Sequence, residues 1–179
     1  VSDGDGGWYV SGDFTDVGGE VTDGVAHILS NGSVDPAFLP TLDGAIGKAL
    51  ALSSDGETLY VGGTISTVNS GTSRLLVAAF DTSDGSVLAF NPHDTTLLTE
   101  VTALALSPDD GTIYVGSRGW ESGSALLAFD AVTGDPASVF NMHGVVGGRV
   151  YSIELSNDGE TLYVGGSFTE VDDGGTLRN

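Results

Sequence analysis

Leu59-Tyr60-Val61-Gly62-Gly63 occurs along the chain in four versions. The other three are Trp8-Tyr9-Val10-Ser11-Gly12, Ile113-Tyr114-Val115-Gly116-Ser117 and Leu162-Tyr163-Val164-Gly165-Gly166. Successive tyrosines in these phrases are about fifty residues apart, and self-similarity at such a period indicates stacked supersecondary units. The sequence is therefore that of a repeat protein.

An apolar run closed by an Asp-Gly turn precedes three of the phrases. The runs cover residues 49–52, 103–106 and 152–155, and the turns are Ser53-Ser54-Asp55-Gly56, Ser107-Pro108-Asp109-Asp110-Gly111 and Ser156-Asn157-Asp158-Gly159. Asp-Gly accepts the positive φ of a tight hairpin turn. Each apolar run and the Tyr-Val strand after it are thus predicted to form a hairpin.

Two further strands are predicted in each repeat. The third runs cover residues 25–29, 75–80 and 125–129, and the short fourth runs cover 36–38, 87–90 and 138–140. Helix is disfavoured because Gly, Ser, Thr, Asp and Val interrupt every window of a dozen residues. The strands are apolar on both faces, as in Leu75 to Phe80, so both faces of each sheet need cover.

Four-stranded antiparallel sheets of about fifty residues, covered on both sides by their neighbours, are the blades of a β-propeller. We therefore predict an all-β fold, a β-propeller with about three and a half repeats in this chain. The repeats cover residues 1–43 (partial), 44–97, 98–145 and 146–179 (partial). A two-sheet sandwich and a β-solenoid are the alternatives, although units of this length are atypical of either.

The phrase Gly165-Gly166-Ser167-Phe168-Thr169-Glu170-Val171, echoed by residues 11–17, resembles the delta-60 type propeller repeat of bacterial surface proteins. The Ser-Pro-Asp-Gly and Tyr-Val-Gly elements are similar to YVTN-type and WD-type blades. This resemblance implies a blade structure and says little about activity. Residues 116–120 and Ile65-Ser66, in the loop after the second strand, depart from the pattern.

The first and last repeats are partial, so the terminal sheets are expected to need further partners. Either more blades complete a ring in a longer polypeptide, or copies associate through the strand Thr161–Phe168 placed before another chain's Trp8 strand. The second option is a head-to-tail contact, which makes rings when it closes and filaments when it does not.

The composition is strongly acidic, with 25 Asp and Glu, 5 Lys and Arg, and a formal net charge of −20. Such a surface repels phosphate backbones and anionic lipids, so nucleic acid is not an expected partner. There is no cysteine and no apolar stretch long enough for a membrane helix. Acidity and the family resemblance favour an extracellular or cell-surface location, where Asn31-Gly32-Ser33 is a glycosylation sequon.

Two of the three histidines, His93 and His143, follow the fourth strands of adjacent repeats and are candidate metal ligands. Repeat inheritance explains their matching positions equally well, and equivalent loops of neighbouring blades are too far apart to share one ion. His27 lies within a strand, where a packed or edge side chain is the simpler interpretation.

Acidic side chains offer three more candidates. Asp3-Gly4-Asp5-Gly6-Gly7 has the rhythm of a calcium loop, but its register matches the hairpin turns of the other repeats. Asp172-Asp173 is interpreted in the same way. Glu154, within an apolar strand, is expected to face a central channel or to pair with a cation such as Arg149.

No residue is assigned a catalytic, cofactor-binding or metal-binding role, and no cofactor is predicted. The sequence favours a non-catalytic extracellular β-propeller that serves as a scaffold or recognition module, with end-to-end self-assembly as one option. Its partners would be proteins, glycans or further copies of the chain. The alternatives are a filament subunit joined by strand exchange and a propeller-type hydrolase or lactonase.

Overall fold

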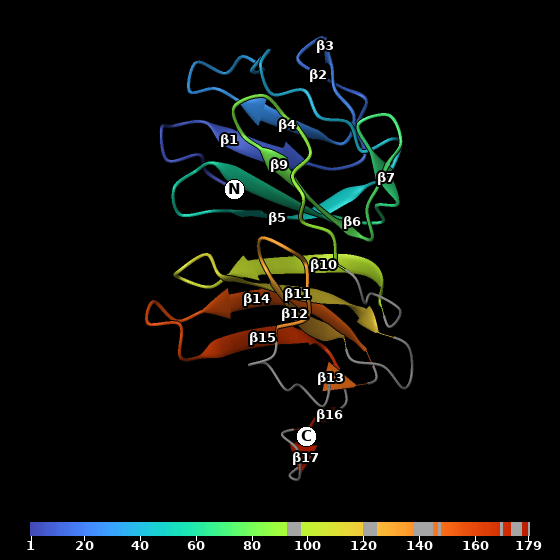
Figure 1. The fold of residues 1–179 in the computed structure, drawn as a ribbon, viewed down its shortest axis with the longest axis vertical. Coiled ribbons are helices and arrows are strands. Elements are labelled where there is room, and N and C mark those ends of the chain that lie inside the picture. The colour runs from blue at the N-terminus through green and yellow to red at the C-terminus, as the bar shows by residue number, and fades with distance from the viewer. Residues whose placement is uncertain are drawn as a thin grey trace. The chain divides into compact units, whose positions relative to one another are not determined.

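The computed structural model describes residues 1–92, 98–119, 125–137, 145–146, 148–168, 170–172 and 177–178. The chain divides into two compact units, unit 1 (Val1–Ala89) and unit 2 (Phe90–Asn179). Both are built of antiparallel strand pairs, and no helix is present among the described residues (Figure 1). The predicted all-β fold class is confirmed.

Unit 1 contains two main sheets. Strand β1 (Trp8–Ser11) pairs with β4 (Val25–Ile28), and β5 (Gly47–Leu52), β6 (Thr58–Gly63) and β9 (Val77–Asp81) form a sheet in that order. Two small hairpins stand between the second and third strands of these repeats: β2 (Asp16–Val17) with β3 (Glu20–Val21), and β7 (Thr67–Val68) with β8 (Thr72–Ser73). Only a loop is predicted from the sequence where these hairpins form.

Unit 2 repeats the arrangement. Strand β11 (Thr112–Gly119) lies between β10 (Leu98–Leu106) and β12 (Leu126–Asp130), and β14 (Arg149–Leu155) pairs with β15 (Leu162–Ser167). One pairing, Arg118 with Arg149, joins β11 to β14. A small sheet follows in the order β13 (Val145–Val146), β16 (Glu170–Asp172) and β17 (Leu177–Arg178).

The four repeated tyrosines occupy the same place in the strand ladders. Tyr60 pairs with Ala51 and Ala79, and Tyr114 pairs with Ala105 and Ala128. Tyr163 pairs with Glu154, and Tyr9 pairs with His27. The periodicity of the sequence is therefore a periodicity of structure, as predicted.

The predicted Ser-x-Asp-Gly turns form with one hydrogen-bond pattern. In each, the serine hydroxyl donates to the aspartate two residues later and accepts from a backbone N–H five residues later. The donated bonds are Ser53 to Asp55 at 2.6 Å, Ser107 to Asp109 at 2.5 Å and Ser156 to Asp158 at 2.5 Å. The accepted bonds, from Thr58, Thr112 and Thr161, are each 2.9 Å long. The bonds donated by the serine hydroxyls, together with a backbone N–H that each carboxylate accepts, lower the pKa of all three aspartates.

The second glycine of the Tyr-Val-Gly-Gly phrase is required by close backbone approach. A Cβ at Gly63 would collide with the carbonyl oxygen of Ile46, and one at Gly166 would collide with that of Arg149. The backbone at the start of the repeat's first strand therefore lies too close to these two glycines to leave room for a side chain. In the third version of the phrase Ser117 stands here, fully buried, and its hydroxyl has no hydrogen-bond partner.

The fourth strand is shorter than the sequence predicts. It reduces to single bridges, in which Val34 pairs with Ile28, Val87 with Phe80 and Pro136 with Phe129. Around Pro36 the cause is local, because proline has no N–H and the N–H of Ala37 donates to the Asp35 carboxylate at 2.9 Å. The third predicted run, residues 138–140, lies outside the described residues.

Each unit has its own apolar core. In unit 1 the core joins Tyr9, Val25 and Phe38 to side chains of the next sheet, namely Leu59, Val61, Ala78 and Phe80. Residues Val77 to Phe80 of β9 are all fully buried, which confirms that both faces of this strand are covered. Leu75 and Leu76, predicted to begin that strand, precede it instead, and Leu76 has a φ of 66°.

In the part of the chain that is described, no helix could span a membrane.

The turns of the two full repeats predict stability changes of opposite sign. Gly56 has a φ of 76°, and the equivalent residue in the next repeat is Asp110, with a φ of 55°. Gly56→Ala should lower the free energy of unfolding by about 1 kcal/mol, because a Cβ is strained in this region. Asp110→Gly should raise it, since glycine relieves the same strain.

Urea denaturation followed by circular dichroism measures both changes. Two shifts of the same sign would contradict the assignment of the left-handed residue in these turns.

Candidate functional site

The most connected polar cluster among the described residues surrounds His27 on β4. Its Nε2 lies 3.0 Å from Asp3 Oδ2, and its Nδ1 lies 2.9 Å from Asp35 Oδ2. The ring stacks on Tyr9 with centroids 4.2 Å apart and planes 15° apart. Phe38 meets both rings edge-on, at 5.2 Å from Tyr9 and 6.4 Å from His27. We call Asp3, Tyr9, His27, Asp35 and Phe38 the His27 cluster.

Both nitrogens of His27 are occupied, which limits the chemistry of the cluster. Each ring nitrogen lies against a carboxylate oxygen, so neither nitrogen is open to a further ligand in this arrangement. Among the described residues, no three acidic, His or Cys side chains are arranged to hold a metal ion.

The carboxylates of the cluster are held in their charged form. Hydrogen bonding to His27, assisted by the N–H groups of Asp5 and Gly7, lowers the pKa of Asp3. Burial acts to raise the pKa of Asp35, but hydrogen bonds from Ala37 and His27 outweigh it and the pKa is lowered. Burial also raises the pKa of Tyr9. The cluster is thus a partly buried network of hydrogen bonds that ties the turn at Asp3–Gly7 to β4 and to Asp35.

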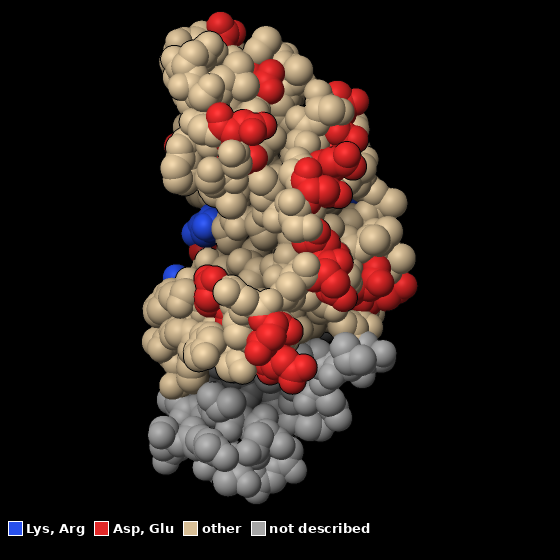
Figure 2. All heavy atoms as spheres, turned by 90° about the vertical axis from the view of Figure 1, so that its left-hand side faces the viewer, with Lys and Arg blue, Asp and Glu red and all other residues tan. Residues whose placement is uncertain are grey.

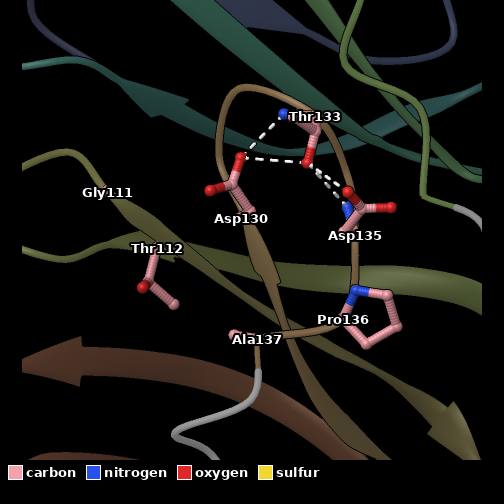
Figure 3. A pocket seen from close by; sticks show the side chains of 7 residues that line it. All are labelled: Gly111, Thr112, Asp130, Thr133, Asp135, Pro136 and Ala137. Atoms are coloured by element: carbon pink, nitrogen blue, oxygen red, sulfur yellow. Dashed lines mark hydrogen bonds between the residues drawn. The ribbon is translucent and has the colours of Figure 1, made fainter.

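A second polar group lines a hollow of about 380 Å³ on unit 2 (Figure 3). Thr133 lies between two carboxylates, with its hydroxyl 3.1 Å from Asp130 Oδ1 and 3.0 Å from Asp135 Oδ2. Asp130 also accepts the N–H groups of Val132 and Thr133, and these bonds lower its pKa. The polar atoms of this hollow are therefore engaged with one another.

The same turn occurs in unit 1, which explains this arrangement without a ligand. There Asp81 accepts the N–H and the hydroxyl of Ser83 at 2.8 and 2.6 Å. The backbone bonds also match, since Gly85 donates to Asp81 and Gly134 donates to Asp130. The hollow on unit 2 is thus one instance of a repeated turn between the third and fourth strands.

The predicted partner of Arg149 is corrected by the structure. Its Nη2 donates to Glu100 Oε2 at 3.0 Å, and its guanidinium lies 5.9 Å from the ring centre of Tyr151. Glu154 is exposed instead, five residues further along β14. Sequence reasoning missed Glu100 because the predicted apolar run begins at residue 103, whereas β10 begins at Leu98 and includes Glu100.

Two sheet faces at the ends of the repeat array expose large aromatic side chains. Tyr163 on β15 is 61% exposed, whereas its equivalents Tyr9 and Tyr60 are both 5% exposed. Tyr151 on β14 and Trp8 on β1 are each 56% exposed. Tyr163 and Trp8 are exposed at positions whose equivalents in unit 1, Tyr60 and Leu59, are buried, which indicates surfaces that lack this cover.

Acidic side chains gather on the side of each unit that Figure 2 presents, with few basic side chains among them. In unit 2 the turns that join β10 to β11 and β14 to β15 carry Asp109, Asp110, Asp158 and Glu160. A surface of this kind attracts cations and repels anions such as nucleic acid.

The remaining predicted candidates have mixed outcomes. His93, His143 and Asp173 lie outside the described residues. Asp3 to Gly7 form a turn, in which Asp3 Oδ1 accepts the N–H groups of Asp5 and Gly7, each at 2.8 Å. Asp172 ends strand β16, and Asn31 lies in a turn where its side chain accepts the N–H of Ser33.

The His27 cluster could have been suspected from the repeat itself. The positions equivalent to His27 hold the small residues Ala79 and Ala128. A large polar residue in place of a buried alanine needs partners, so the repeat marks His27 as exceptional without identifying Asp3 and Asp35 as those partners.

The cluster predicts how stability depends on pH. His27→Phe keeps a ring beside Tyr9 but removes both bonds to the carboxylates. Since the pKa values of Asp3 and Asp35 are lowered, their contribution is present above the ordinary Asp pKa of about 3.9 and is lost as the pH falls through their folded values. The variant should melt below the wild type near neutral pH, and the difference should narrow in acid.

Thermal unfolding followed by circular dichroism between about pH 7 and pH 2 measures the difference. A difference that does not change with pH would mean that His27 acts through packing alone.

Comparison with protein families gives one match. A family described as "Domain of unknown function (DUF5122) beta-propeller" matches residues 4–38, a segment that contains β1 to β4 and most of the His27 cluster. Among curated proteins, none matches the chain. The chain is an all-β protein of propeller-type repeats, similar over residues 4–38 to this β-propeller domain.

Proposed function

We propose that the chain is a non-catalytic scaffold of a secreted or surface-attached microbial protein, in which propeller-type repeats stack on further repeats. The exposure of Tyr163, at a position that is buried in unit 1, carries this proposal. A sheet with one uncovered face is incomplete as a blade, because stacking on a neighbour is what removes its aromatic side chains from water.

The polar clusters support a structural role. The carboxylates of Asp55, Asp109 and Asp158 accept hydrogen bonds within their own turns, as do those of Asp81 and Asp130. His27 is held at both nitrogens. A catalytic site would need a nucleophile beside a free base, or a carboxyl kept protonated near neutral pH. In the described residues the aspartates with a resolved shift have lowered pKa values, which is the opposite tendency.

The proposed location rests on charge and on the blade motif. A net charge of −20 keeps a protein soluble at high concentration and discourages binding to anionic lipid and nucleic acid. The resemblance of residues 165–171 to the delta-60 type repeat of bacterial surface proteins points the same way. Partners of a surface scaffold would be proteins, glycans or further copies of the chain.

Self-assembly is the measurable consequence of this function. The mass of the purified chain should grow with protein concentration between about 1 µM and 100 µM, because the uncovered faces associate by mass action. Light scattering coupled to size-exclusion chromatography gives the mass, and electron microscopy shows whether the assemblies are rings or fibres. A constant monomer mass over this range would refute a self-assembling scaffold.

A further inference from the structure

The stacking rule of this chain is visible within unit 2. One apolar cluster joins Ala103, Ala105 and Tyr114 of the β10–β11 side to side chains of β14 and β15, namely Val150, Ile153, Leu162 and Val164. The hydroxyl of Thr102 also donates to the backbone carbonyl of Val150. The tyrosine side of one sheet therefore packs against the Leu/Val side of the next.

Unit 1 follows the same rule. Tyr9 and Val25 of the β1–β4 sheet share a core with Leu59 and Val61 of β6 and with Phe80 of β9. Leu59 and Val61 are the equivalents of Leu162 and Val164, since each pair flanks the repeated tyrosine. Two independent interfaces in the chain thus use the same pairing of sheet sides.

The β14–β15 sheet has a tyrosine side that the other described residues leave exposed, which we call the Tyr163 face. It consists of Tyr163, Tyr151, Ser152 and Glu154, all exposed. Tyr151 interrupts the β14–β15 register as a bulge, at the position where Thr102 contacts the next sheet in the preceding repeat. The face is therefore built from the positions that make the interface elsewhere.

Glu154 is compatible with a covered face. Its equivalent, Ala105, remains half-buried although it belongs to the stacked core of unit 2. A longer side chain at this position can keep its carboxylate in water while the strand around it is covered. Stacking on the Tyr163 face thus does not require a buried, unpaired charge.

The first sheet offers the complementary side, which we call the Trp8 face. Trp8 and Val10 flank Tyr9 as Leu59 and Val61 flank Tyr60, and Ile28 pairs with Trp8 as Phe80 pairs with Leu59. Trp8 is exposed, and Val10 and Ile28 are half-buried. These three side chains stand where the internal interfaces place leucine, valine and phenylalanine.

We propose that the Tyr163 face binds the Trp8 face of a second copy of this chain, so that copies join head to tail by stacking sheets. This inference rests on the proposed scaffold function and names its partner. This contact has the same face-to-face packing as the two interfaces within the chain. It differs from strand exchange, in which the edge of β15 would pair with a strand of another copy. Because the two faces differ, the contact is heterologous and gives a ring or a fibre.

The test uses two variants of the full chain, Trp8→Glu and Tyr163→Glu, each of which places a charge on one face. Each variant alone keeps one unaltered face, but the face that this one must bind on another copy carries the new charge. Self-association of each variant should therefore weaken at least about tenfold. Mixed in equal amounts, the two should form a one-to-one dimer that grows no further. Analytical ultracentrifugation of the variants and of the mixture measures all three cases.

Val21→Glu is the matched control, because Val21 is exposed, lies on β3 outside both faces and receives the same charge change. It should assemble like the wild type, and circular dichroism checks that all three variants are folded. If the wild type assembles and both face variants assemble equally well, the proposed contact is wrong while the scaffold function stands. If the wild type stays monomeric, the scaffold function fails as well.

Discussion

Burial of both faces of each sheet is the constraint on which the rest of this structure depends. A four-stranded sheet of short strands has too little core of its own, so it gains stability only when neighbouring sheets remove its apolar faces from water. The core of unit 1 shows this directly, because Tyr9 of one sheet and Leu59 of the next belong to the same cluster. Repetition along the chain follows, since each sheet must present compatible sides to both neighbours.

Polar chemistry in this chain serves that stacking. The serine and aspartate side chains of the hairpin turns satisfy backbone N–H groups that the short strands leave unpaired. The acidity of the protein is therefore partly a by-product of its many turns. The hairpin ends are negative, which suits solubility, whereas the exposed sheet faces carry large aromatic side chains, which suits stacking.

Features that depend on neighbouring residues were predictable from the sequence, and features that join distant ones were not. The Asp-Gly turns and the tyrosine register followed from short patterns with a clear physical basis. His27 and Asp3 are 24 residues apart in the sequence, and Arg149 and Glu100 are 49 apart, so no local sequence pattern predicts either contact. The fourth strand was overestimated because proline and an aspartate-capped turn compete with strand pairing at Asp35 to Ala37.

The His27 cluster also has a consequence for folding fidelity. Similar repeats in one chain can exchange places during folding, since their strands have nearly interchangeable ladders. A histidine that needs two particular carboxylates is satisfied only when β4 lies beside the first turn and the Asp35 segment. Any swapped arrangement would leave a polar ring among apolar neighbours. The hydrogen bonds of this one side chain therefore favour the native order of the sheets over arrangements in which similar sheets have exchanged places.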